Sequence, residues 1–473
     1  MQNVRSSPFL TAAKPRLKRL LALLHQQCTY ASILGTDVSG KNFRVSDRVT
    51  SISDTYWGER GFVVRVFNDG WYFEYAFNEL PADDNALPAL ADKIVAAAKT
   101  SQNTNGFTYP TPAEDEITQT FIDQVQTLPT DLGPQEIIER LTAINKQMHT
   151  HSDLLVDATV TLGYAQTSKI FLSAKKDLEQ HYIWSESALI PVARKGDVTR
   201  DLYHVVSGMT GFEMLDDVAT AVPELIATIV ILLDAEPTPP GEYDVICSPN
   251  AVGLIAHEAF GHGVELDMFL KNRANAKEYM GKPVAAPQLK MHDGATATRH
   301  TASYLFDDEG NLGSDTVVIE GGILQAGISD ALAAASLGLP PTGNGRRQTF
   351  ANKAYSRMTN TYFASGTDKL DDMIASIDHG YLIMEGTSGM EDPKDWGIQC
   401  MFSYAKEIKD GKLTGKWVAP IVMTGYVPDL LKNITMISDD MSFDGGGGCG
   451  KGHKEWVKVS CGGPYIKTKA RLG

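Results

Sequence analysis

The sequence predicts an α+β protein of two domains, with mainly antiparallel sheets and packed helices. Three pairs of strand-like runs are separated by short turns that contain glycine, a pattern typical of β-hairpins. The pairs are residues 62–67 with 71–77, 316–319 with 323–328, and 402–408 with 413–422. Hairpins make antiparallel sheets, whereas parallel strands need long crossover connections. Helix-like segments lie among these runs, so the α+β class is favoured over a doubly wound parallel sheet.

Length and one proline-rich segment indicate where the two domains meet. With 473 residues, 43% of them apolar, the chain exceeds one ordinary domain and can form two cores. Residues 234–241 contain three prolines and a glycine, after the apolar run 225–233 and before the strand-like run 243–247. We therefore expect an N-terminal α+β domain over residues 1–236 and a C-terminal domain rich in β-hairpins over residues 242–473.

Two helices are expected in the N-terminal half. Leucines at positions 17, 20, 21 and 24 follow the helical period and predict an amphipathic helix over residues 15–28, beginning near Pro15. Pro134 precedes a second helix-like segment, residues 135–148. Proline is favoured at the first position of a helix, where its missing N–H has no partner to lose.

Composition narrows the class of protein. The apolar run 225–233 is far shorter than the roughly 20 residues that span a bilayer, and the first residues lack the pattern of a signal peptide. The 58 acidic residues outnumber the 43 basic ones, and a net charge of −15 repels phosphate backbones. We expect a cytoplasmic protein without a membrane span and without a nucleic-acid partner.

The most informative segment is His257-Glu258-Ala259-Phe260-Gly261-His262. Two imidazoles suit zinc, and the carboxylate of Glu258 can take a proton from metal-bound water. In a regular α-helix, residues five apart point about 140° away from each other, too far to share one ion. We expect His257 on a helix that continues residues 252–256, with His262 swung inward where Gly261 and Gly263 break or bulge that helix. On the hexapeptide alone, two ordinary histidines fit equally well.

Cysteine usage suggests a third metal ligand. The five cysteines, at positions 28, 247, 400, 449 and 461, are widely spaced and odd in number, so they do not form a disulfide framework. Cys449 lies in a glycine-rich stretch where the backbone can approach an ion, and Lys451 would favour its thiolate. Cys449 is therefore the preferred third ligand. His453 and Cys461 remain alternatives that spacing alone does not exclude.

Several other motifs are weaker. Residues 445–451 nearly spell a phosphate-binding loop, but Gly452 replaces the Ser or Thr that binds magnesium, which argues against nucleotide binding. Residues 307–310 have the composition of a calcium loop without its final glutamate, so a solvated turn is favoured. Glu265 and Asp267 are candidate partners for the ligand imidazoles, although an ordinary polar face explains them as well.

A cluster of basic and amide residues is a candidate for substrate binding. Its members are Asn344, Arg346, Arg347, Arg357 and Asn360. Guanidinium forks pair well with carboxylates, so Asn344 and Arg346 are the residues we expect to contact a substrate. The same side chains fit equally well as residues that hold a loop together.

The chain resembles the TldD/PmbA family of metallopeptidases, in its metal-bearing TldD-like branch. The resemblance is carried by H-E-A-x-G-H at residues 257–262 and C-G-K at residues 449–451, with residues 307–310, 341–347 and 357–362 in the family's order. It implies that His257, His262 and Cys449 are metal ligands and that Glu258 is the catalytic carboxylate. The chain departs from the family pattern after Lys451, and at Cys461, where an aliphatic residue is usual.

Motif and resemblance together predict a zinc-dependent peptidase with one Zn²⁺ per metal-bearing subunit, whose metal-bound water is activated by Glu258. The resemblance implies small peptides or unfolded proteins as substrates. It also implies a dimer, either with a homologous subunit that lacks the metal motif or with a second copy. One alternative is a non-catalytic subunit or binding protein with a structural metal site. Another is a regulator that acts on DNA or a DNA enzyme, which would need a basic patch that the sequence does not show.

Overall fold

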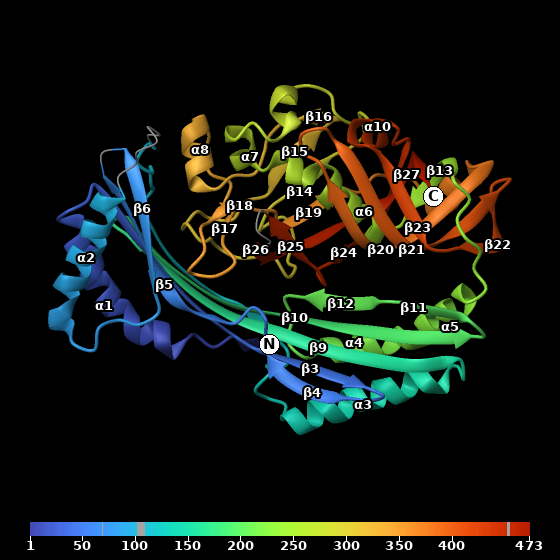
Figure 1. Cartoon of the computed structure of the whole chain (residues 1–473), viewed down its shortest axis with the longest axis horizontal. Coiled ribbons are helices and arrows are strands. Elements are labelled where there is room, and N and C mark those ends of the chain that lie inside the picture. Colours follow the sequence, from blue (N-terminus) through green and yellow to red (C-terminus); the bar gives the residue numbers. More distant parts are fainter. Residues whose placement is uncertain (69, 102–108, 452–454) are drawn as a thin grey trace.

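The computed structural model describes residues 1–68, 70–101, 109–451 and 455–473. In this part of the chain, two large sheets are formed, one by each half of the sequence. Figure 1 shows the N-terminal sheet as a long curved layer, with the C-terminal half lying along one of its faces.

The N-terminal sheet has the strand order β11-β10-β9-β2-β5-β6, with β12 and β7 also pairing with β10, and β3 and β4 attached through β9. Apart from β7, which runs parallel to β10, its strands pair antiparallel. Its strands are β2 (Tyr30–Ser39), β3 (Lys41–Ser46), β4 (Thr50–Asp54), β5 (Glu59–Asn68), β6 (Trp71–Phe77), β7 (Ile117–Ile122), β9 (Leu155–Ser173), β10 (Lys176–Lys195), β11 (Val198–Asp201) and β12 (His204–Gly208). A separate small sheet joins β1 (Gln2–Asn3) to β8 (Gln124–Val125).

Helices cover one face of this sheet, as Figure 1 shows for α1, α2 and α3. The helices are α1 (Pro8–His25), α2 (Leu87–Thr100), α3 (Pro134–Thr150), α4 (Met214–Thr220) and α5 (Val222–Leu232). Side chains alternate between the two faces of a strand. On β9, Val160 and Leu162 pack in the core with α3 and α5, whereas Ala165, Thr167 and Lys169 line a cavity on the opposite face. The second face is therefore available to the C-terminal half.

The C-terminal sheet has the strand order β13-β20-β21-β23-β27-β19-β14-β15-β16, with β22 beside β21 and β24 beside β27. Among the described strand pairs of this sheet, β13 with β20 and β19 with β27 are parallel. Its strands are β13 (Gly241–Cys247), β14 (Met291–Asp293), β15 (Thr316–Glu320), β16 (Ile323–Leu324), β19 (Asn360–Phe363), β20 (His379–Glu391), β21 (Gly397–Lys409), β22 (Lys412–Val418), β23 (Ile421–Tyr426), β24 (Met436–Asp444) and β27 (Ser460–Leu472).

Two small hairpins and several short helices complete the C-terminal half. The hairpins are β17 (Gly345–Arg346) with β18 (Tyr355–Ser356), and β25 (Gly448–Lys451) with β26 (Glu455–Lys458). The helices are α6 (Pro249–Ala256), α7 (Leu266–Leu270), α8 (Ala331–Leu337), α9 (Leu370–Ala375) and α10 (Val427–Lys432). Four apolar residues of α6, Ala251, Val252, Ile255 and Ala256, are fully buried in one core with β13, β20, β21 and β27, which fixes the position of the segment that follows α6.

The predicted α+β class, with mainly antiparallel sheets, is confirmed. The three predicted hairpins correspond to β5 with β6, β15 with β16, and β21 with β22. The strand predicted over residues 413–422 is divided into β22 and β23, and both parts pair with β21. The break falls at Pro420, whose ring removes a backbone N–H and so interrupts a ladder of hydrogen bonds.

The first predicted helix begins earlier than expected. It starts at Pro8 rather than near Pro15, because Ser7 caps it: the Ser7 hydroxyl accepts a hydrogen bond from the N–H of Leu10 at 3.1 Å. Pro8 then occupies a first-turn position, where a proline is tolerated. The helix predicted after Pro134 is observed as α3.

The strands of the N-terminal sheet end by Gly208 and those of the C-terminal sheet begin at Gly241. The division into domains over residues 1–236 and 242–473 stays a prediction. Residues 101–112, whose composition predicts a long surface loop, lie mostly outside the described residues. Within the described part of the chain, none of the helices has both the length and the apolar character that a membrane crossing requires.

Candidate metal centre

The spacing of the two histidines is accommodated by a change of helix type. Helix α6 runs directly into a π-helix over His257–Gly261 and then a short 3₁₀ turn over His262–Val264. A π-helix bonds residue i to residue i+5, so residues five apart return to the same side. The ring centroids of His257 and His262 are 5.3 Å apart, at an interplanar angle of 84°. The helix therefore widens at this point, where the sequence predicted a break or a bulge.

The flanking glycines are needed for space. Gly261 has an ordinary right-handed φ of −59°, and a Cβ there would lie 2.1 Å from the sulfur of Met358. A Cβ at Gly263 would lie 3.2 Å from a carboxyl oxygen of Glu391. Neither glycine has a left-handed backbone, and the predicted bulge takes the form of the π-helix that ends at Gly261. Both glycines let neighbouring side chains approach the helix closely.

Cys449 comes to the histidines on the hairpin of β25 and β26. Its sulfur lies 3.4 Å from Nε2 of His262. The buried guanidinium of Arg357 fixes the hairpin by donating to the carbonyl oxygens of Cys449 at 2.5 Å and Glu455 at 2.8 Å. The candidate ligand atoms of His257, His262 and Cys449 lie within 4.8 Å of one another. The structure therefore brings together the three residues that the sequence singled out.

Electrostatics of this trio suit a bound cation. Burial alone would raise the pKa of the Cys449 thiol, but the adjacent imidazoles of His262 and His257 hold it well below its usual value. Burial would likewise lower the pKa of His262, but the sulfur of Cys449 and the carboxylate of Glu265 raise it well above its usual range. Among the described residues, Nδ1 of His257 is buried without a hydrogen-bond partner. Two imidazoles and a thiolate are a donor set that zinc prefers, so the residues fit the metal.

Glu265 orients one of the imidazoles. One of its carboxyl oxygens lies 3.4 Å from Nδ1 of His262, which leaves Nε2 facing Cys449. Burial would raise the pKa of Glu265, but Lys451, at 3.0 Å, and His262 bring it down to about 2. Asp267, the other candidate partner for an imidazole, instead binds Lys451 at 2.5 Å. Lys451 thus neutralises these carboxylates, and the imidazoles are what stabilise the Cys449 thiolate.

The trio faces a cavity of about 640 Å³, which we call the metal cavity. Its walls are the end of β20, residues 387–391, and the glycine-rich residues 447–451. Glu258 is half-buried on the same wall as the histidines. A Cβ on Gly389 would lie 2.5 Å from Cγ of Glu258, so the glycine leaves room for that side chain.

No motif in the sequence points to Glu391, which lies at the end of β20. Both of its carboxyl oxygens are buried without a hydrogen-bond partner among the described residues, and it lines the metal cavity. Burial raises its pKa well above the usual value, against the opposing charge of His262. Glu391 lies in an ordinary polar segment, Met390-Glu391-Asp392, and only the fold shows what it faces.

The alternative ligands differ in position. Cys461 lines the metal cavity but does not belong to the three-residue group, and burial raises the pKa of its thiol. His453 lies outside the described residues. The glycine-rich residues before Lys451 lead into strand β25, without the helix that a phosphate-binding loop requires.

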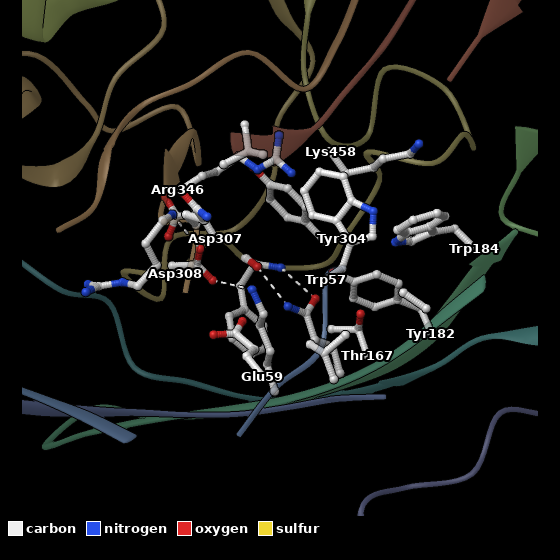
Figure 2. Close-up of a pocket in the computed structure, with 18 of the residues that line it drawn as sticks. Trp57, Glu59, Thr167, Tyr182, Trp184, Tyr304, Asp307, Asp308, Arg346 and Lys458 are labelled. Atoms are coloured by element: carbon white, nitrogen blue, oxygen red, sulfur yellow. Dashed lines mark hydrogen bonds and ion pairs between the residues drawn. The ribbon is translucent and has the colours of Figure 1, made fainter. Parts of the chain in front are cut away.

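The two candidate substrate-binding residues occupy different environments. Asn344 is fully buried, and its amide donates to Asp293 at 2.8 Å and to the carbonyl oxygen of Arg357 at 3.0 Å, which leaves it a structural part of the core. Arg346 is half-buried and lines a second cavity, shown in Figure 2. Arg347 pairs with Glu74 at 3.0 Å and holds the two halves together. Of these residues, Arg346 is therefore the one open to a ligand.

The solvated turn expected at residues 307–310 is wrong. Asp307, Asp308 and Glu309 are all buried. Asp308 forms an ion pair with Lys169, and Glu309 pairs with Arg65 at 2.5 Å. Both basic partners lie in the N-terminal half, so these carboxylates form part of the contact between the two halves.

Comparisons with known proteins find metallopeptidases. Residues 240–471 match the model of the PmbA/TldA metallopeptidase C-terminal domain. The chain is 28% identical to a metalloprotease of Synechocystis over 97% of its own length and 98% of that protein. It is 32% identical to the zinc metalloprotease TldD homolog of Saccharolobus solfataricus over 60% of its own length and 63% of that protein.

A solved structure shares the fold. TldE from Thermococcus kodakarensis superimposes on this chain with a TM-score of 0.75 at 16% identity. The match covers 97% of this chain and 100% of the TldE chain. At this identity the match shows the fold alone. The sequence matches, over residues 240–471 for the family model and over 97% of the chain for the Synechocystis metalloprotease, show that the chain belongs to the TldD/PmbA family of metallopeptidases.

Proposed function

We propose that this chain is a zinc-dependent peptidase that hydrolyses peptide bonds in small or unfolded polypeptides. One observation carries this proposal: the imidazoles of His257 and His262 and the sulfur of Cys449 converge within 4.8 Å beside Glu258, in one cavity. These three residues would hold the zinc ion, which supplies Lewis acidity for the carbonyl group of a peptide bond.

Glu258 is proposed as the general base and acid. Its carboxylate lines the metal cavity, and no hydrogen bond or ion pair to it is found among the described residues, so its oxygens are free to accept a proton. It would take that proton from the attacking water and deliver it to the nitrogen of the leaving amine. A general base must lie within reach of the reacting atoms. Glu258 directly follows His257, which is a proposed metal ligand.

The walls of the metal cavity suit an extended peptide. The end of β20 pairs with β21 on one side, while β13 pairs only with residues 380–383 on the other. Residues 387–391 therefore present a strand edge to the cavity. An extended peptide can bind such an edge through main-chain hydrogen bonds, with little dependence on sequence. Short peptides and unfolded chains expose an extended main chain of this kind, which supports small or unfolded substrates.

Pairing with a homologous subunit or a second copy is also proposed. Three exposed apolar residues, Met390, Met401 and Tyr426, are 68%, 41% and 42% exposed and lie on one face of the C-terminal sheet. Met390 also lines the metal cavity, so a subunit covering this face would enclose its rim. Light scattering measures this association, first on the chain purified alone and then on the chain co-expressed and purified with a homologous subunit.

The decisive experiment combines elemental analysis with an assay on an unstructured peptide, followed by mass spectrometry. The wild-type chain is expected to carry zinc and to cleave the peptide. Glu258→Gln is expected to keep the zinc and to lose turnover by at least about a hundredfold, as is typical when a general base is removed. Glu385→Gln is the matched control, because Glu385 lies on the same strand β20 but does not line the metal cavity. A wild-type chain that binds zinc but cleaves nothing would instead support a structural metal site.

A further inference from the structure

We propose that a second cavity, between the N-terminal sheet and the C-terminal half, is a subsite that takes an apolar side chain of the peptide substrate. This rests on the proposed peptidase function and adds a preference to it. We call this space the aromatic cavity. Figure 2 shows Thr167, Tyr182 and Trp184 rising from the N-terminal sheet toward Tyr304 and Arg346. Trp57 and Trp456 also line it.

The aromatic cavity adjoins the metal cavity. Trp456 lines both of them. A Cβ on Gly448 would lie 3.2 Å from the ring of Trp57 and 3.3 Å from the ring of Trp456. Gly448 is the residue before Cys449, so the aromatic wall begins one residue from a proposed metal ligand. A peptide held at the metal centre therefore has a nearby side chain within reach of the aromatic cavity.

Both lysines that line the aromatic cavity are already paired. Lys458 forms an ion pair with Glu186 and lies 4.6 Å from the ring centroid of Trp184. Lys169 forms an ion pair with Asp308. Because these two lysines are already paired, neither is free for an anionic ligand. Six aromatic side chains share the lining of the cavity: Trp57, Tyr182, Trp184, Tyr304, Phe306 and Trp456.

Two charged groups of the lining, Arg346 and Glu59, form no ion pair among the described residues, and each is held by a neighbour inside the protein. Arg346 donates to the carbonyl oxygen of Met358 at 2.7 Å, and its guanidinium lies 5.5 Å from the ring centroid of Tyr304. Glu59 accepts a hydrogen bond from the N–H of Phe350 at 2.6 Å, and burial raises the pKa of its carboxyl to about 7. A carboxyl group that is half protonated near neutral pH is a weak receptor for a cation.

The size of the aromatic cavity limits what it can hold. Its volume is about 70 Å³. One water molecule needs about 10–15 Å³ measured in this way, so the space holds several waters or a branched aliphatic side chain such as that of leucine. Releasing those waters from aromatic surface into bulk solvent is the driving force for binding an apolar group.

A binding experiment tests the aromatic cavity without requiring hydrolysis. Three of the six tryptophans, Trp57, Trp184 and Trp456, line it, so tryptophan fluorescence reports its occupancy. N-acetyl-leucinamide is expected to give a saturable fluorescence change that N-acetyl-glycinamide does not give. The change should disappear in Trp184→Ala and in Ala165→Leu, which fills the cavity from β9 and keeps all three reporters. Trp417→Ala, a tryptophan stacked on Tyr404 and outside both cavities, is the matched control and should keep it.

A cleavage experiment connects the aromatic cavity to the metal centre. Peptides carrying Ala, Leu, Glu or Lys at each position near the cleaved bond are compared by kcat/KM. At one position the wild-type chain is expected to prefer Leu over Ala by about tenfold or more, the selectivity typical of a hydrophobic pocket. The ratio should fall toward one in Ala165→Leu and Trp184→Ala and persist in Trp417→Ala.

The two experiments separate failure of this subsite from failure of the proposed function. Cleavage without any preference for Leu, a preference for Glu or Lys, or a preference that survives in both cavity variants overturns the subsite and leaves the peptidase standing. Binding of N-acetyl-leucinamide that is lost in both variants, without cleavage of any peptide, supports the cavity and overturns the peptidase. Equal fluorescence changes with the two amides overturn the cavity as an apolar site.

Discussion

The sulfur of Cys449 lies 3.4 Å from Nε2 of His262, although the two residues are 187 positions apart in the chain. Two short elements produce this contact. One is a π-helix that turns His262 toward His257, and the other is the hairpin of β25 and β26, whose carbonyl oxygens accept hydrogen bonds from Arg357. The candidate metal centre thus depends on the packing of two separate segments, and the predictions below test that packing as well as the chemistry.

Replacing the cysteine tests the third ligand. Cys449→Ser should lower zinc affinity by at least about a hundredfold, because a thiolate is a much better zinc ligand than a hydroxyl. Zinc content after dialysis against a calibrated chelator measures the change. Cys461→Ser is the control, since Cys461 lines the same cavity outside the three-residue group. Equal loss of zinc in both variants would contradict the assignment.

Glu265 should tune the metal site through His262. Glu265→Gln removes the charge that faces Nδ1 of His262, and loss of such a partner typically lowers metal affinity by about 10–100-fold. Asp267 also pairs with Lys451 but contacts no imidazole, so Asp267→Asn should retain most of the zinc affinity. Thermal unfolding of both metal-free proteins separates a general loss of stability from a specific loss of zinc.

Gly261 should not tolerate a larger residue. In Gly261→Ala, the new Cβ would lie 2.1 Å from the sulfur of Met358, and overpacking of this kind destabilises a core by about 1–3 kcal/mol. Urea unfolding measures the free energy. Gly397→Ala is the control, because a Cβ at Gly397 meets nothing within 4 Å. If the clash is the cause, Met358→Ala in the Gly261→Ala background should recover part of the loss, and no recovery would point to the backbone instead.

Glu59 should make stability depend on pH. Burial raises the pKa of its carboxyl from 4.5 to about 7, so the folded protein binds this proton more tightly than the unfolded chain. That contribution to stability is fully present below pH 4.5 and is lost as the pH rises through about 7. Glu59→Gln keeps an acceptor for the N–H of Phe350 and removes the titration.

The free energy of unfolding of wild type and Glu59→Gln, measured in urea at several pH values, tests this effect. The difference between the two proteins should shift in favour of the variant as the pH rises from about 4.5 to 8, by an amount on the order of 1–3 kcal/mol. Comparing the two proteins at each pH cancels the contributions of the other carboxyl groups. A difference that stays constant over this range would show that Glu59 does not titrate as described.

Local patterns in the sequence determined much of the architecture. The hairpins, helix α3 and the α+β class follow from turn chemistry and from the periods of helix and strand, which act over a few neighbouring residues. The same kind of reasoning singled out His257, Glu258 and His262, because unusual spacing and flanking glycines can be read directly. It also narrowed the third ligand to three residues, Cys449, His453 and Cys461, without separating them by geometry.

The tertiary structure decided what depends on distant segments meeting. It brought Cys449 to His262, gave the carboxylates of Asp308 and Glu309 their partners Lys169 and Arg65, and placed Glu391 on the wall of the metal cavity. A charged run reads as a solvated turn unless its buried partners are known, since burial of a carboxylate requires a cation that the local sequence does not contain. The aromatic cavity has the same origin, because its walls come from strands of both halves and exist only where those halves pack together.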